Sequence, residues 1–119
     1  MSVLDDQEKR AKAERAAQRV AKERAEQFRK DVQDLMALPA MRRVLSDFID
    51  DAGLDRSAFR DDHGAMACVA GWQDAARWWI DAVRQHCPER ETAMRAEARS
   101  RAKQEAREGD TNEDDDVHS

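Results

Sequence analysis

Apolar side chains recur at intervals of three and four residues in the middle of the chain, the spacing of one face of an α-helix. The first run predicts a helix from about Asp31 to Ala52, with Gly53 as its C-terminal cap. Pro39 either begins a new helix after Leu38 or kinks a single helix, because proline fits best in a first helical turn. The stripe consists of Leu35, Leu38, Met41, Leu45, Phe48 and Ala52, widened by Val44 and Ile49.

The second run predicts a helix from about Ala65 to His86. Cys87 and Pro88 end it, because the residue before a proline is pushed out of the helical region. At 100° per residue the apolar positions form a face about 140° wide, the width of a core-facing helix. This face consists of Met66, Val69, Trp72, Ala76, Trp79, Ile80 and Val83.

The segment between these helices, from Leu54 to Gly64, predicts a loop. Its apolar residues Leu54 and Phe59 are expected to fold back beneath the two helices. Turn and helix-capping chemistry follows in Asp61, Asp62, His63 and Gly64. Two amphipathic helices and this loop predict a helical hairpin that supplies nearly all of the core.

The back of the second helix carries an unexpected tryptophan. Trp78 lies opposite the apolar face, beside a row of small residues formed by Ala67, Gly71 and Ala75. Small residues permit close backbone approach, and a large aromatic residue supplies buried area. We therefore expect Trp78 to be covered by the N-terminal arm, by the helix after Pro88 or by another protein chain.

The flanking segments are helical in composition but have little to bury. Residues 5–30 are nearly all Ala, Arg, Lys, Glu and Gln, and Val20 and Phe28 are nearly their only large apolar residues. In residues 89–108 the only large apolar residue is Met94. The predicted units are a charged helical arm (1–30), the hairpin core (31–88), a charged C-terminal helix (89–108) and a disordered acidic tail (109–119).

Composition supports an all-α fold. Of 119 residues, 39% are charged, and there are only four glycines, two prolines and no tyrosine, which leaves little material for a many-stranded sheet. No apolar run of about 20 residues encodes a membrane span. The N-terminus lacks the basic start and apolar centre of a secretion signal, so we expect a cytosolic protein whose two cysteines stay reduced.

Charge is strongly segregated around a formal net charge of −5. Residues 1–30 carry nine Lys/Arg against six Asp/Glu, whereas residues 109–119 carry five acids and no Lys/Arg. Cations that could line one side of the N-terminal arm are Arg15, Arg19, Lys22, Arg29 and Lys30. Interspersed glutamates and an acidic chain disfavour nucleic acid as the main partner, because nucleic-acid-binding domains normally present a dominant basic field.

Residues with catalytic or ligand chemistry do not form a known motif. Cys68, Cys87, His63 and His86 lack the short, regular spacing of zinc ligands. No nucleophile elbow, phosphate-binding loop or dinucleotide fingerprint occurs. We therefore expect neither a metal nor a cofactor, and we expect that the protein is not an enzyme.

Residues 34–98 resemble a family of small tailed-bacteriophage proteins named for a Bordetella phage gene product. The matching positions are Leu35, Pro39-x-x-Arg42-Arg43-Val44-Leu45, Ala52-Gly53-Leu54, Ser57-Ala58-Phe59, Gly71, Cys87-Pro88-Glu89, Met94 and Glu97. The chain departs from the family pattern at Met41 and Ala76, where glycines are usual, and at Trp72 and Gln73, where arginines are common. The resemblance implies a tailed-phage origin, location in a virion or host cytoplasm, and no catalytic residues.

Arg42 and Arg43 link the resemblance to physical chemistry. Adjacent helix positions differ by 100°, so both side chains cannot point into the core. Either they form a solvated face, with an arginine stem covering apolar surface, or they clamp carboxylates. The candidate acids are Asp61 and Asp62 within the chain, or carboxylates of a partner.

These observations predict a structural or assembly protein of a tailed bacteriophage that contacts capsid, portal or scaffold components through its helices. Self-association is expected too, since the arms gain order mainly by coiled-coil-like pairing. The alternatives are a phage regulator that binds nucleic acid through residues 1–30, and an inhibitor of a host enzyme. The candidate partner-contact residues are Trp78, Gly71, Ala67, Ala75, Arg42 and Arg43.

Overall fold

Four helices and no strand make up the part of the chain that the computed structural model describes, which is the backbone of residues 3–118 and the side chains of residues 3–110. The helices are α1 (Val3–Met36), α2 (Pro39–Ala52), α3 (His63–His86) and α4 (Pro88–His118). The predicted all-α class is confirmed. Of the predicted acidic tail, residues 111–119 lie outside the side chains described, so its disorder stays a prediction.

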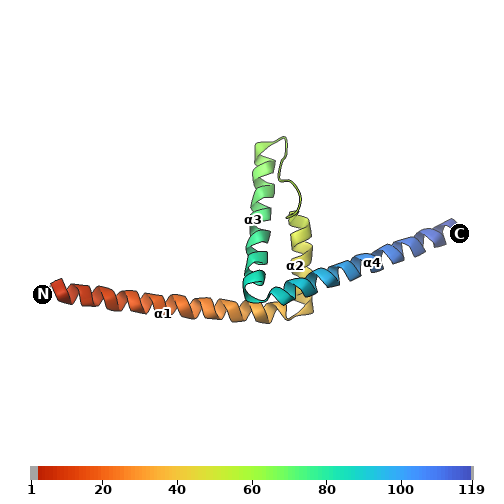
Figure 1. Cartoon of the computed structure of the whole chain (residues 1–119). Helices are drawn as coiled ribbons and strands as arrows, with labels where there is room; N and C mark the ends of the chain where they lie inside the picture. The colour runs from red at the N-terminus through yellow and green to blue at the C-terminus, as the bar shows by residue number, and fades with distance from the viewer. Residues whose placement is uncertain (1–2, 119) are drawn as a thin grey trace.

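The shape is extended. Helices α2 and α3 form a hairpin that stands on a base made by the end of α1 and the start of α4, and the rest of α1 and α4 projects in opposite directions (Figure 1). The chain measures 92 × 39 × 17 Å, with a radius of gyration of 23.3 Å. A compact chain of this length has a radius of gyration of about 14 Å. The two arms therefore dominate the outline of the molecule.

The two prolines divide the helices. Helix α1 ends at Met36. Leu38 has an extended backbone, and Pro39 follows it in the first turn of α2. Of the two alternatives for Pro39, a new helix is thus the observed one. Pro88 begins α4 in the same way after Cys87, because a proline in the first turn removes only an N–H that has no intrahelical partner.

The core lies where all four helices meet. Its fully enclosed large side chains are Met36 from α1, Ile80 and Val83 from α3, and Met94 from α4. The buried residues of the whole cluster are Val32, Met36, Leu45, Ile49, Ala52, Ala76, Ile80, Ala82, Val83, Cys87 and Met94. Ten of these eleven residues lie in the predicted core segment, 31–88, and the base of α4 adds Met94 where it crosses the hairpin.

Several members of the predicted apolar stripes stay exposed. Leu35, Leu38 and Val44 remain in contact with solvent. Helix α2 packs against its neighbours through other members of the same stripe, and Leu45, Ile49 and Ala52 are buried there. Four helices of which two are mostly free arms cannot surround α2, so its widened stripe is only partly covered.

The loop between α2 and α3 is held by polar groups rather than by both predicted apolar residues. Leu54 packs on the core, but Phe59 is 68% exposed, so its predicted position beneath the helices is wrong. The buried Gln73 side chain donates instead to the carbonyl oxygens of Gly53 and Arg56, each at 2.7 Å. Asp62 caps α3 by accepting from the Ala65 amide at 2.9 Å, as capping chemistry predicted.

Two glycines offer a matched test of this backbone. Gly53 has a φ of +66°, and an added Cβ would lie 2.8 Å from Arg56 Nε, whereas a Cβ on the helical Gly71 meets nothing within 4 Å. We expect Gly53→Ala to lower the free energy of unfolding by about 1–2 kcal/mol. Gly71→Ala should raise it by about 0.5–1 kcal/mol. Urea unfolding of both variants measures this, and equal effects would contradict the assigned conformations.

Candidate functional site

One side of α3 is open along most of its length. Ala67, Gly71 and Ala75 are all exposed, and Trp78 continues the same row toward the base of the hairpin. We call these four residues the α3 face. The structure therefore places the predicted small-residue row and its tryptophan together on one accessible surface.

The N-terminal helix covers part of Trp78. The Phe28 ring of α1 lies 5.8 Å from the Trp78 ring between centroids, and Trp79 meets Trp78 edge-on at 5.3 Å. His86 also contacts Phe28, at 5.7 Å. Trp78 nevertheless remains 55% exposed. Cover by the arm, one of the predicted alternatives, is thus real but incomplete.

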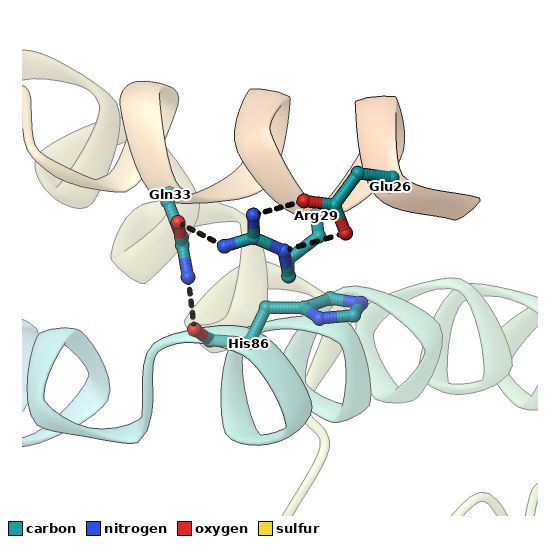
Figure 2. A network of polar contacts seen from close by, with 4 residues as sticks. All are labelled: Glu26, Arg29, Gln33 and His86. Carbon is teal, nitrogen blue, oxygen red and sulfur yellow. Dashed lines mark hydrogen bonds and ion pairs between the residues drawn. The ribbon is translucent and has the colours of Figure 1, made fainter. Parts of the chain in front are cut away.

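A chain of polar contacts holds α1 against α3 beside these rings (Figure 2). Arg29 pairs with Glu26 through two nitrogens and donates to Gln33 Oε1 at 3.0 Å. Gln33 Nε2 donates in turn to the His86 carbonyl oxygen at 2.9 Å. That carbonyl is in the last turn of α3, where carbonyl groups lack intrahelical partners. The hydrogen bond from Arg29 lowers the pKa of the Glu26 carboxyl group.

This network changes the predicted basic side of the arm. Arg29, which the sequence placed with the other cations of the arm, is engaged with Glu26 and Gln33 at the base. Its guanidinium positions α1 rather than facing a distant partner. Phe28, which no spacing singled out, is held next to Trp78 by the same stretch of helix.

Arg42 is a clamp, but for a different acid from those predicted. Its Nε lies 2.9 Å and 3.2 Å from the two carboxylate oxygens of Glu97, and its Nη2 forms an ion pair with Glu97 at 2.9 Å. Its Nη1 donates to the Met36 carbonyl oxygen at 2.8 Å. Asp61 and Asp62, considered as partners from sequence, instead lie at the start of α3.

Arg42 therefore joins three helices at the base of the hairpin. It is buried on α2, its carboxylate partner belongs to α4, and the carbonyl group that it binds ends α1. The hydrogen bond from Arg42 lowers the pKa of the Glu97 carboxyl group. Arg43, in contrast, is exposed. Of the arginine pair, only Arg43 remains accessible to a partner.

The cysteine and histidine residues lie apart. Cys68 is exposed on α3, whereas Cys87 is buried at the helix junction, where burial raises the pKa of its thiol. Within the described residues, no three His, Cys, Asp or Glu side chains are grouped as metal ligands. No described helix combines the length and apolar character needed to cross a membrane.

A second tryptophan is exposed elsewhere on α3. Trp72 is 54% exposed and packs against Phe48 of α2, with a centroid separation of 5.8 Å. It lines a cleft of about 230 Å³ with Val69, Gln73 and the loop. The sequence placed Trp72 in the core and gave Gln73 no role. The side-chain amide of Gln73 is buried instead because it satisfies two loop carbonyls.

Comparison with known proteins gave no relative, because no family model, no curated protein and no solved structure matches the chain.

Proposed function

We propose that the protein is a non-enzymatic structural or assembly protein of a tailed bacteriophage, and that it contacts capsid, portal or scaffold components through its helices. The observation that carries the proposal is the half-exposed Trp78 at the end of the small-residue row on α3. The phage setting rests on the resemblance of residues 34–98 described above.

The α3 face has the chemistry of a helix-packing surface. Gly71 and its alanine neighbours leave the backbone accessible, so the side chains of a second helix can pack closely against it. Trp78 provides a large, rigid apolar group with an N–H donor, and tryptophan is among the residues that dominate binding energy at protein interfaces. A partner helix lying along α3 would bury both features at once.

The architecture supports a contact role as well. Helix α3, which carries the α3 face, projects from the base made by α1 and α4 (Figure 1), and Phe28 of α1 contacts this face at Trp78. Arg42 and Glu97 join α4 to α2, and Gln33 joins α1 to α3, so the hairpin and the two arms are held in a defined relation. A protein of this shape can connect components that lie several nanometres apart.

The variant that tests the surface is Trp78→Ala. We expect it to reduce binding to the partner at least about tenfold, since interface tryptophans often contribute about 2 kcal/mol or more. Stability should fall only modestly, because Trp78 is 55% exposed and loses only its ring contacts with Phe28 and Trp79. Copies of the protein in purified virions and assembly intermediates, counted by mass spectrometry, provide the measurement.

Trp72→Ala is a closely matched control. Trp72 and Trp78 have nearly equal exposure, and each packs on one phenylalanine ring at 5.8 Å. Incorporation should therefore fall for Trp78→Ala and persist for Trp72→Ala. Equal incorporation of both variants would reject the α3 face as the docking surface, and absence of the protein from all particles and intermediates would reject the assembly role.

A further inference from the structure

The exposed surface of α1 carries a run of unpaired cations. These residues, the basic stripe, are Lys12, Arg15, Arg19 and Lys22. They recur at three- and four-residue intervals and line one open hollow along the helix together with Gln18. Within the described residues, no carboxylate forms an ion pair with any of the four. Glu14 lies about 100° around the helix from Arg15, and Glu8, Glu23 and Glu26 flank the stripe at its two ends.

The densest negative charge of the chain lies at its other end. Residues 109–119, the acidic segment, contain Asp110, Glu113, Asp114, Asp115 and Asp116 without a single Lys or Arg. The stripe thus carries four positive charges and the segment five negative charges. Complementary charge of this kind favours association and sets the register of the partners.

The acidic segment cannot reach the stripe of its own chain. At a helical rise of about 1.5 Å per residue, Lys22 lies about 21 Å from the end of α1 at Met36. Residue 109 lies about 32 Å from the start of α4 at Pro88. The two arms project in opposite directions (Figure 1), so their helical lengths add. The sum of these lengths is about 50 Å. Eleven residues extend over about 40 Å at most. Contact between the two must therefore involve separate copies.

We infer that the basic stripe of one copy binds the acidic segment of a second copy, so that the protein associates head to tail. Such a contact uses different surfaces on its two members and leaves one of each free, so it extends into open chains rather than stopping at a dimer. The contact consists of exposed ion pairs, which are individually weak and strongly screened by salt. It is separate from the α3 face, so either inference can fail without the other.

Sedimentation of the full chain at several concentrations tests the inference. At about 25 mM salt the weight-average mass should rise with concentration, and at about 250 mM salt the association constant should fall at least tenfold, because the Debye length shrinks with ionic strength. Two charge-reversed variants make the test specific. The stripe variant carries Lys12→Glu, Arg15→Glu, Arg19→Glu and Lys22→Glu. The segment variant carries Glu113→Lys, Asp114→Lys, Asp115→Lys and Asp116→Lys.

Each reversed variant alone should stay monomeric, because its stripe and segment then carry the same sign. An equimolar mixture should associate again, since each altered surface meets its complement. A control variant changes the same number of charges off the stripe and should associate as the wild type does: Arg10→Glu, Arg24→Glu, Arg99→Glu and Lys103→Glu. Circular dichroism verifies that all variants stay helical.

Three outcomes would overturn the inference. One is a wild-type mass that changes with neither concentration nor salt. Another is a mixture of reversed variants that fails to associate. The third is a stripe variant that loses binding to a short DNA duplex while the association of the chain itself is unaffected, which would assign the stripe to nucleic acid.

Discussion

Replacing Met94 with alanine is expected to lower the free energy of unfolding by about 3 kcal/mol. The Met94 side chain is fully buried where α4 crosses the base of the hairpin, and removal of such a side chain loses transfer free energy and leaves a cavity. Small domains have a total stability of about 5–15 kcal/mol, so this loss would be a large fraction of it. Urea unfolding followed by circular dichroism measures the change.

Two controls separate packing from the general sensitivity of α4. Met94→Leu roughly conserves volume and should cost less than about 1.5 kcal/mol. Arg99→Ala alters an exposed position of the same helix and should change stability by no more than about 0.5 kcal/mol. A Met94→Ala variant as stable as the wild type would mean that α4 does not complete the core.

Breaking the Arg42–Glu97 pair is the second change expected to have a large effect. Glu97→Ala removes the only carboxylate bound by Arg42 in the described structure and leaves the guanidinium group buried. Loss of one partner of a buried ion pair costs about 3–5 kcal/mol, and partial exposure of Glu97 places the expectation at about 3 kcal/mol. Arg42 retains its bond to the Met36 carbonyl, so the chain should still fold.

The double variant Arg42→Met, Glu97→Leu should recover much of that loss. Apolar residues of similar volume remove both charges and their desolvation cost together. If the single Glu97→Ala variant were as stable as the wild type, the pair would be a surface contact without structural weight. If the double variant were less stable than both the wild type and Glu97→Ala, the hydrogen bond from Arg42 to the Met36 carbonyl would be the dominant interaction.

The same pair predicts how stability depends on pH. Because Arg42 lowers the pKa of Glu97 in the folded protein, the stabilisation is complete above the pKa of the unfolded carboxyl group and is lost as pH falls through the folded value. The stability difference between wild type and Glu97→Gln should therefore be largest near neutral pH and shrink in acid. Since the pKa values of Glu26 and Glu91 are lowered too, comparison with this variant isolates the contribution of Glu97.

The candidate contact surface was only partly predictable from sequence. Positions of Ala67, Gly71, Ala75 and Trp78 on one side of α3 follow from the helical period, and that side is exposed in the structure. The partial cover of Trp78 by Phe28 depends on how α1 crosses α3, which no local pattern specifies. Similarly, arginine spacing suggested a clamp, but only the packing of α4 brings Glu97 to Arg42.

The sequence by itself determined the local features of this protein. Helix-forming composition, two first-turn prolines and the left-handed Gly53 specify the all-α class, the helix boundaries near these residues and the charged arms, because propensity and capping act within a few residues. Only the tertiary structure decided that α4 buries Met94, that Gln73 replaces Trp72 as the buried residue beside the loop, and that Phe59 stays exposed. These outcomes depend on contacts between segments distant in sequence, where burial and hydrogen-bond satisfaction outweigh the local preference of any one residue.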